Sequence, residues 1–468
     1  MKAIKLFSLT ACLLASVQAW SATLIDGIYY SLGTGGAIVV SGGSQSYSGN
    51  LVIPPSVFSG GTIYFVLSIG DNAFSYCTAL TSVTIPSSVT SIAGTAFSNC
   101  SGLTAINVDA ANSNYSSDGG VLYNKNKTTL ICCPCGKTGS FVVSAGVTSI
   151  SNGAFYGCSA LTSIDVDAGN NNYSSDGGVL YNKNKTTLIL CPEGKTGSYV
   201  IPSGVTSIGG GAFSDCMALT SVIISSGVQS IGNSAFMNCI NLTSITIPNT
   251  VTTIDNWAFF GCGFTSITIP DGVTSIGIDA FAGSNLTSIV IPNSIKSLAD
   301  YAFEDCEKLT SVTIGSGVTS IGGWAFVSCS SLNSITCLVT NPSTITMGDY
   351  VFDGVDVSHC ILNVPVASVD LYKNAPQWKD FQISKITTGV ETPTADALHI
   401  FPNPVTDYIT VSGLQNTETL RLYNINGQLM LTRQVTNETE NIAVGHLPAG
   451  VYFIKTNKGQ TLKWVKNK

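Results

Sequence analysis

Residues 235–254 read AFMNCINLTSITIPNTVTTI, and this stretch is one copy of a unit that fills most of the chain. The pair Ala-Phe recurs with its phenylalanine at positions 74, 97, 155, 213, 236, 259, 281, 303 and 326. The spacing is 22 or 23 residues, apart from two intervals of 58 that each contain one unit and an insertion of 35 residues. Self-similarity at a fixed period of this length indicates a solenoid, in which the repeated units stack.

The apolar positions of the unit predict its local structure. Leu242, Ile245 and Ile247 follow the pattern of a short strand with alternate residues facing inward. Val251 and Ile254 form a second apolar pair, which a turn rich in Gly and Asn follows. One unit cannot bury its own apolar edge, so we expect stacked units to share a continuous core. The strands of successive units would then form a parallel sheet along the array.

The residues between the apolar positions of each strand are expected to face solvent. They are almost all hydroxyl side chains, so the exposed face would be polar and nearly uncharged. We take as the candidate binding face Thr81, Ser82, Thr84, Thr243, Ser244, Thr246, Thr310, Ser311 and Thr313.

The unit A-F-x-x-C-x-x-L-x-x-I-x-I-P-x-x-V-x-x-I-G resembles the BspA-type leucine-rich repeats of bacterial surface proteins. The resemblance covers residues 71–336 closely, with residues 20–70 as an N-terminal capping segment and 337–386 as a C-terminal cap. It implies a mainly β leucine-rich-repeat solenoid of about 23-residue units. It also implies adhesion or protein binding rather than catalysis.

The two insertions are near copies of each other, because residues 114–130 recur as 172–188. Each is expected to form a hairpin with a polar four-residue loop. The loops carry Lys125 and Lys127 in one copy and Lys183 and Lys185 in the other. These lysines are candidate contacts for a partner, although an ordinary solvated loop is the favoured interpretation.

The amino terminus has the pattern of a signal peptide. Lys2 and Lys5 precede an apolar run and a small-residue cleavage site, so residues 1–19 are expected to be removed. The alternative is a lipobox ending at Cys12, but the apolar run continues past this cysteine. No later stretch has 18 consecutive apolar residues, so no transmembrane segment is expected in the mature chain.

The last 71 residues differ from the repeats. Residues 387–397 are predicted to be a linker, and short alternating runs in 398–468 predict a small β-sandwich. This segment resembles the type IX secretion sorting domain of Bacteroidota in Pro402, Asn403, Pro404, Gly427, Gly450 and Lys455. The resemblance implies that the secretion machinery is a partner, that the tail is cleaved, and that the protein is released or attached to the outer surface of a Gram-negative bacterium. The alternative is an adhesive β-sandwich.

The charge distribution excludes one class of partner. Residues 20–397 carry 11 Lys and 23 Asp or Glu, and the only arginines of the chain are Arg421 and Arg433 in the tail. A nucleic-acid-binding surface needs clustered Lys and Arg to contact phosphates. We therefore expect no nucleic-acid partner.

Cysteine recurs at one position of the repeat. Eight cysteines lie three residues after the repeat phenylalanine, and the ninth unit has Ser284 instead. A small side chain rather than a bond is needed there, so buried thiols are favoured over disulfides. Cys132 and Cys135 form a C-x-x-C pair, but the twin insertion does not repeat it and no histidine completes a zinc set.

No catalytic constellation, cofactor site or metal site stands out. His359 is the only histidine outside the tail, and nothing around it marks a nucleophile elbow. Asp109, Asn112 and Asn114 offer oxygen ligands, but not with EF-hand spacing, so a calcium site in the insertion is the weaker alternative.

The sequence thus favours a non-catalytic cell-surface or secreted binding protein. Its partner would be a protein or glycan on a host or neighbouring bacterial surface. Aromatic turn residues are expected to add contacts, and they are Tyr76, Tyr156, Trp257, Tyr301 and Trp324. The alternatives are a passive structural spacer and, with less support, a glycosidase or peptidase.

Overall fold

The computed structural model describes residues 22–41, 47–386, 399–401, 408–412, 414, 418–424, 428–435, 439–445, 447–448, 450–457 and 461–466. The chain divides into two compact units, Met1–Lys385 and Ile386–Lys468, and each is treated by itself. The predicted signal peptide and linker lie outside the described residues, as do Pro402, Asn403, Pro404 and Gly427.

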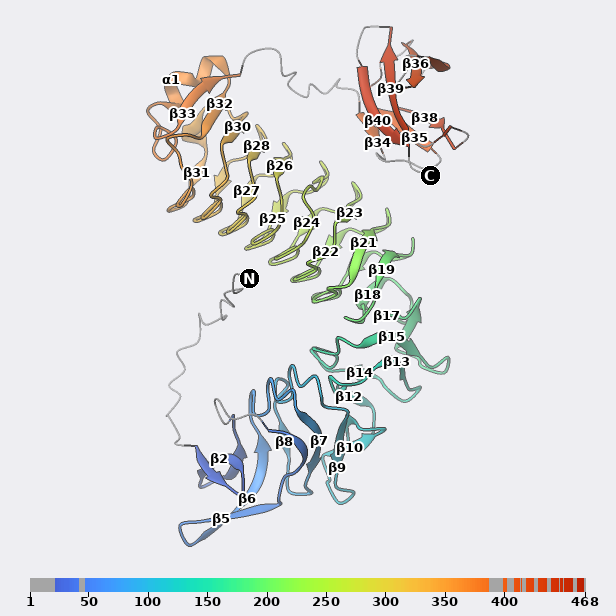
Figure 1. Cartoon of the computed structure of the whole chain (residues 1–468), viewed down its shortest axis with the longest axis vertical. Coiled ribbons are helices and arrows are strands. Elements are labelled where there is room, and N and C mark those ends of the chain that lie inside the picture. The colour runs from blue at the N-terminus through green and yellow to red at the C-terminus, as the bar shows by residue number, and fades with distance from the viewer. Residues whose placement is uncertain are drawn as a thin grey trace. The chain divides into compact units, whose positions relative to one another are not determined.

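The first unit is a stack of coils, most of which contribute one long strand made from the L-x-x-I-x-I pattern (Figure 1). The stacked, mainly β solenoid with turns of about 23 residues is confirmed. The long strands pair in parallel within four sheets of three, two, three and five strands. These sheets are β4 (Gly49–Val52), β7 (Leu80–Ile85) and β9 (Ala105–Val108); β13 (Gly139–Val143) and β15 (Leu161–Val166); β19 (Gly197–Val200), β21 (Leu219–Ile223) and β23 (Ser244–Thr246); and β26 (Ser288–Ile291), β28 (Ser311–Ile314), β30 (Ser334–Cys337), β32 (Ile361–Val364) and β33 (Gln382–Lys385).

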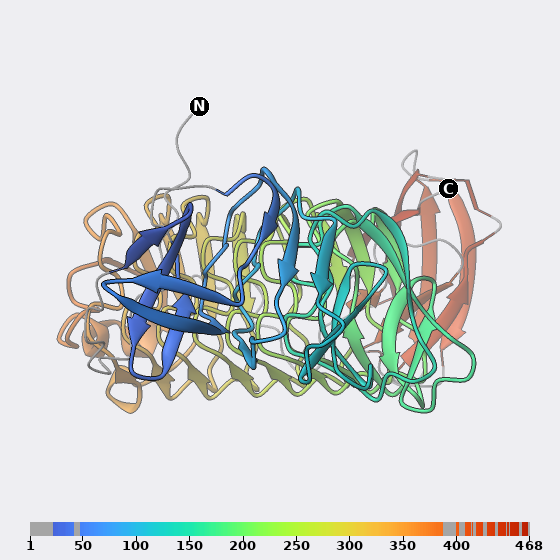
Figure 2. The same ribbon diagram turned by 90° about the horizontal axis from the view of Figure 1, so that it is seen from below.

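The second apolar pair of each unit also forms a strand, two residues long. These short strands are β8 (Ser91–Ile92), β14 (Ser149–Ile150), β20 (Ser207–Ile208), β22 (Ser230–Ile231), β24 (Thr253–Ile254), β25 (Ser275–Ile276), β27 (Ser297–Leu298), β29 (Ser320–Ile321) and β31 (Thr346–Met347). Seven of them, from β20 to β31, continue a ten-stranded sheet (Figure 2). The expected parallel pairing of the long strands is confirmed, but their sheet is interrupted in three places, and the short strands form the longest continuous ladder.

The insertions explain two of the interruptions. Each is an antiparallel meander, formed by β10 (Tyr115–Asp118), β11 (Val121–Asn124) and β12 (Thr129–Cys132) or by β16 (Tyr173–Asp176), β17 (Val179–Asn182) and β18 (Thr187–Leu190). The predicted hairpins are thus confirmed, with one additional strand each. The amide of Ile106 on β9 donates to the Gly120 carbonyl, and that of Ile164 on β15 to the Gly178 carbonyl, both at 2.8 Å. The insertion therefore occupies the place beside each long strand where the next one would pair.

A buried asparagine fixes each insertion to the coil before it. The Asn112 amide nitrogen donates to the carbonyls of Pro86 and Val89, while its Oδ1 accepts from the amides of Asn114 and Tyr115. Asn170 makes the same four hydrogen bonds in the second copy. Because these bonds already engage the asparagine oxygens, the geometry does not favour them as calcium ligands.

The Ala-Phe turn connects consecutive coils through the main chain. The phenylalanine amide donates to the alanine carbonyl of the next coil, as from Phe213 to Ala235 at 2.7 Å and from Phe236 to Ala258 at 2.8 Å. In most coils the residue before Ala and the second residue after Phe have positive φ, as at Ser234 (54°) and Asn238 (58°). These left-handed residues turn the chain sharply on either side of the pair.

The phenylalanine rings form a column through the core. Rings of consecutive coils from Phe213 to Phe352 stack with centroids 4.8–5.7 Å apart. This spacing matches the separation of paired strands. Perpendicular aromatic contacts close the column at its C-terminal end, where Trp378 and Phe381 pack edge-on against Phe352.

The segments at the two ends of the array are irregular. The N-terminal segment contains β1 (Thr23–Ile25), β2 (Ile28–Gly33), β3 (Gly36–Val39), β5 (Ser56–Ser59) and β6 (Thr62–Ile69), paired in the order β1-β2-β3-β6-β5. The C-terminal segment contains the 3-10 helices η1 (Pro342–Thr344) and η2 (Val366–Ser368) and the helix α1 (Val369–Tyr372).

The repeated cysteines are buried thiols that donate hydrogen bonds. All fourteen described cysteines are free. The Cys239 thiol donates to the carbonyl of Phe213 in the coil before, at 3.1 Å, and Cys262 does the same to Phe236. Burial raises the pKa of the Cys100 thiol to about 12, so this group stays protonated at neutral pH and can donate.

The second unit is a small β domain with two antiparallel sheets. One contains β34 (His399–Phe401), β35 (Tyr408–Ser412) and β38 (Thr439–Ala443), and the other β36 (Glu418–Asn424), β37 (Leu429–Val435), β39 (Gly450–Thr456) and β40 (Thr461–Lys466). Val411, Leu422, Ile454 and Trp464 are buried in its core.

The cysteine hydrogen bonds predict a difference between two substitutions. Cys239→Ala removes the thiol donor and leaves a small cavity, so we expect a loss of about 1–2 kcal/mol in the free energy of unfolding. Cys239→Ser keeps a donor and should lose less. Denaturant unfolding of both variants measures the difference, and equal losses would contradict a hydrogen-bonding role for the thiol.

The carboxyl group of Glu193 is expected to make the stability of the folded protein depend on pH. Its Oε1 accepts from the Gly157 amide at 2.7 Å, and burial raises its pKa from 4.5 to about 8. The folded state therefore keeps a proton that the unfolded state loses, and stability falls as the pH rises from about 4.5 to 8.

We expect Glu193→Gln to remove this decline and to stabilise the protein at pH 8 by roughly 1–4 kcal/mol. Thermal unfolding between pH 5 and pH 8 measures the effect. The exposed Glu307→Gln is the control and should follow the parent protein. A parent-like pH profile for Glu193→Gln would contradict the account.

Candidate binding surface

The nine hydroxyl residues of the candidate binding face are all exposed or half-buried. Strand pairing aligns several of them across coils. Ser288, Ser311 and Ser334 are in register on β26, β28 and β30, and Thr313 pairs with Thr336. The outward positions therefore form columns that cross consecutive coils within each sheet.

One column of hydroxyls is already engaged in holding the coils together. The Thr243 hydroxyl donates to the carbonyl of Thr220 at 3.3 Å, and that of Thr310 to the carbonyl of Thr287 at 2.9 Å. The Thr81 hydroxyl donates to Asn50 Oδ1 at 2.9 Å. A hydroxyl has one donor and two acceptor sites, so these groups keep accepting capacity for a partner.

The outward face is not purely polar. Val52 is in register with Thr84, Val200 with Ile223 and Val290 with Thr313, each pair in a different sheet. The exposures of the three valines are 66%, 60% and 61%. These valines were not among the predicted site residues, although they occupy the alternating outward position of their strands. Hydroxyl and apolar side chains thus occur at the same outward strand position of neighbouring coils.

The aromatic candidates lie in the Ala-Phe turns rather than on the strands. Tyr76 and Tyr156 are exposed, while Trp257, Tyr301 and Trp324 are half-buried. Tyr301 and Trp324 stack with centroids 5.4 Å apart. Trp324 also stacks on Tyr350, which is 64% exposed. The sequence analysis missed Tyr350 because Val351 replaces the alanine of the repeat there.

The lysines at the insertion tips already have partners within their own insertions. Lys127 pairs with Asp118 at 2.9 Å, and Lys185 with Asp176 at 3.0 Å. Lys125 donates to the Ala110 carbonyl at 3.0 Å, and Lys183 donates to the Asn170 carbonyl. All four amines are thus held in place, and a partner would have to compete with these contacts.

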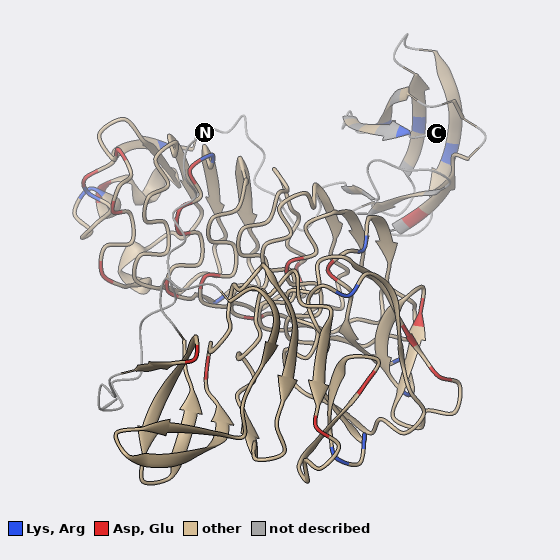
Figure 3. Ribbon diagram, turned by 60° about the horizontal axis from the view of Figure 1, so that its bottom comes forward, with Lys and Arg blue, Asp and Glu red and all other residues tan. Residues whose placement is uncertain are grey.

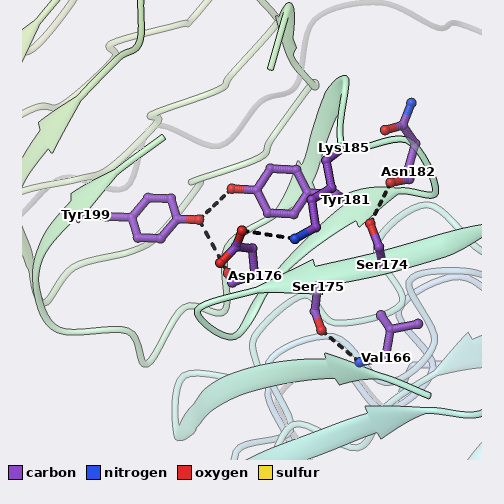
Figure 4. A network of polar contacts seen from close by, with 8 residues as sticks. All are labelled: Val166, Ser174, Ser175, Asp176, Tyr181, Asn182, Lys185 and Tyr199. Carbon is purple, nitrogen blue, oxygen red and sulfur yellow. Dashed lines mark hydrogen bonds and ion pairs between the residues drawn. The ribbon is translucent and has the colours of Figure 1, made fainter. Parts of the chain in front are cut away.

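A polar network stiffens the second insertion (Figure 4). The hydroxyls of Tyr181 and Tyr199 are hydrogen-bonded to each other, and the Tyr199 hydroxyl also reaches the Asp176 carbonyl at 3.5 Å. Burial raises the pKa of Tyr199 to about 12. The first insertion has Phe141 at the place of Tyr199, so this network is specific to the second copy.

The surroundings of His359 do not form a catalytic relay. Asp356 Oδ2 and the Ser358 hydroxyl both contact His359 Nδ1, at 2.7 and 3.1 Å, on an exposed loop. A Ser-His-Asp triad uses different ring nitrogens for its acid and its nucleophile. Among the residues that the structure describes, no group of His, Cys, Asp or Glu could hold a metal ion.

In the tail, Gly450 begins β39 and Lys455 lies within it, with its amine 5.6 Å from the centre of the Tyr423 ring. Across the described segments of the chain, no helix is long and apolar enough to cross a membrane.

Several solved structures are similar to this chain. A leucine-rich repeat protein from Eubacterium ventriosum is 25% identical, with 72% of this chain and 95% of that chain covered and a TM-score of 0.47. A leucine rich cell surface protein from Faecalibacterium prausnitzii is also 25% identical, covering 69% and 96% with a TM-score of 0.37. The pneumococcal vaccine antigen PcpA is 17% identical, covering 79% and 99% with a TM-score of 0.43. No curated protein matches the sequence.

Two family models match the chain. The BspA type leucine rich repeat region matches in six copies, over residues 64–134, 191–264 and 254–375. The secretion system C-terminal sorting domain matches residues 399–467. The chain therefore belongs to the family of BspA-type leucine-rich repeat proteins, and it ends in a type IX secretion sorting domain.

Proposed function

We propose that the protein is a non-catalytic binding protein of the outer cell surface, or a secreted one. The observation that carries the proposal is the set of exposed outward positions that strand pairing holds in register across coils. The sorting domain implies secretion and attachment at the outer cell surface. The partner in this proposal is a protein or glycan on a host or neighbouring bacterial surface.

The chemistry of the outward face supports binding. Serine and threonine hydroxyls offer hydrogen bonds, and the exposed valines beside them offer apolar surface. Main-chain hydrogen bonds between coils hold both kinds of side chain in fixed positions before a partner arrives. Such preorganisation lowers the entropy that binding would cost. Extended solenoid surfaces are suited to large partners for the same reason.

The tail supports the route of export. We propose that residues 398–468 are recognised by the type IX machinery, removed, and followed by release or attachment of the array. The motif residues Gly450 and Lys455 both lie on strand β39 of the small β domain.

The export proposal predicts that deletion of residues 398–468 prevents delivery to the surface. We expect the amount of repeat array that is labelled on intact cells to fall by at least about tenfold, with the missing protein retained inside the cells. A fusion of the tail to an unrelated exported protein should restore delivery of that protein. Normal surface labelling of the shortened chain would contradict the proposal.

The binding proposal predicts that charge on the outward face weakens association with the partner. The double change Val200→Asp and Val290→Asp alters exposed side chains only. We expect at least about a tenfold loss of binding to host matrix proteins, bacterial surfaces or glycan arrays, whichever the mature protein binds.

The matched control is Leu371→Asp, which changes an exposed apolar residue of helix α1 in the C-terminal segment. It should bind like the parent protein. A passive spacer would bind none of these surfaces. Unchanged binding of the double variant would also contradict the proposed face.

A further inference from the structure

Five consecutive coils carry large or charged side chains at one position, the residue before the Ala-Phe pair. This position holds Trp257, Asp279, Tyr301, Trp324 and Tyr350. In earlier coils the same position holds small or polar residues such as Asn72, Gly153, Gly211 and Ser234. We call the first set, together with Asp300 and Glu304 beside it, the aromatic-acidic ridge.

The aromatic residues of the ridge stand where the fold favours glycine. Trp257, Tyr301, Trp324 and Tyr350 have φ between 53° and 59°. A left-handed conformation is unfavourable for a residue with a side chain. Ring stacking offsets part of this cost. The array itself does not need aromatic rings at this position, because earlier coils fold with glycine there.

The rings form a continuous strip. Tyr301 and Trp324 stack with an interplanar angle of 4°, and Trp324 and Tyr350 stack at 5.6 Å. Tyr350 is largely exposed, and the other two rings are half-buried. The strip therefore presents aromatic edges, and the exposed Tyr350 ring, to a partner.

The turns that carry the strip also contain carboxyl side chains and contain no basic residue. The turns 255–261, 277–283, 299–305, 322–328 and 348–354 contain seven Asp or Glu and no Lys or Arg. Figure 3 shows how sparse charged residues are elsewhere on the ribbon. The nearest lysines in sequence are Lys296 and Lys308, each three residues outside the turn 299–305, and Lys308 donates to Asn285 Oδ1 at 2.7 Å.

The carboxyl groups crowd one another. Burial raises the pKa of Asp279 above its usual range. Burial and the neighbouring Asp305 and Asp279 raise the pKa of Glu304 to about 7. A cation placed here would relieve this repulsion.

We propose that the aromatic-acidic ridge binds an arginine-rich segment of the partner protein. This inference rests on the proposed binding function and assigns the partner chemistry. A guanidinium group is planar, so it can stack on Tyr and Trp rings while it donates hydrogen bonds to carboxylates. A neutral glycan could stack but would not use the charge, and acidic partners would be repelled.

The test uses the mature protein and labelled octapeptides of arginine, lysine and glutamate, with a neutral oligosaccharide as a fourth probe. We expect the arginine peptide to bind most tightly and its affinity to fall as salt rises. The double change Tyr301→Gly and Trp324→Gly should weaken its binding by at least about tenfold. Glycine is the native residue of this position in other coils, so folding should be retained.

A charge variant and a control complete the test. The double change Asp300→Asn and Glu304→Gln should weaken binding of the arginine peptide and make its affinity less dependent on salt. Tyr76→Asn is the matched control. Tyr76 is an exposed tyrosine outside the ridge, and asparagine is native at the equivalent position of the next coil, where it is Asn99. It should bind like the parent protein.

The inference is overturned if the ridge variants bind the arginine peptide as tightly as the parent protein does. It is also overturned if the ridge variants lose binding of the oligosaccharide instead. In either case the proposed function still stands when the mature protein binds cell surfaces and the Val200→Asp, Val290→Asp variant does not. Absence of binding to every surface and every probe would remove both proposals.

Discussion

The hydrogen bond from the repeat phenylalanine amide to the alanine carbonyl of the next coil, which six of the nine repeat phenylalanines make, is the interaction on which the array depends. It fixes the separation of the coils and stacks the phenylalanine rings at nearly the strand spacing. The left-handed residues around the pair, the buried thiol and the threonine hydroxyls all act between the same neighbouring coils. Each coil is therefore held by its neighbours rather than by a core of its own.

Because most of these contacts use inward and turn positions, the outward positions can carry functional side chains. Inward Leu, Ile, Val, Phe and Cys are needed for packing, and several turn positions must tolerate positive φ. Packing in the core places fewer constraints on the outward strand positions and on the residue before Ala-Phe. Replacement of glycine by tryptophan or tyrosine at that residue changes the surface without changing the framework.

Much of the fold could be predicted because every unit of the repeat has the same spacing of apolar residues. The period, the long strands and the insertion hairpins follow from apolar spacing alone. The second apolar pair of each unit was visible in the sequence, but its strand could not be predicted, because two residues such as Thr253–Ile254 are too few to show the alternation of a strand. The interruption of the long-strand sheets depends on a tertiary contact, from Ile106 to Gly120, that spacing does not reveal.

The candidate site was only partly predictable for the same reason. Exposure of the hydroxyls followed from strand alternation, but their engagement with the previous coil did not, as Thr310 shows. The insertion lysines looked free in the sequence, yet Lys127 pairs with Asp118, nine residues earlier across the meander. Tyr350 was missed because the repeat motif is altered beside it. The stacking of Tyr301, Trp324 and Tyr350 required the geometry of neighbouring coils.

The central claim is that outward side chains of the repeat array contact the partner. Hydroxyl-radical footprinting of the mature protein, alone and bound to a surface protein or glycan that it captures, tests this claim most directly. The account predicts reduced oxidation at outward side chains such as Val200, Val290, Tyr301 and Trp324 on binding. Protection confined to other parts of the chain, with these residues unchanged, would contradict it.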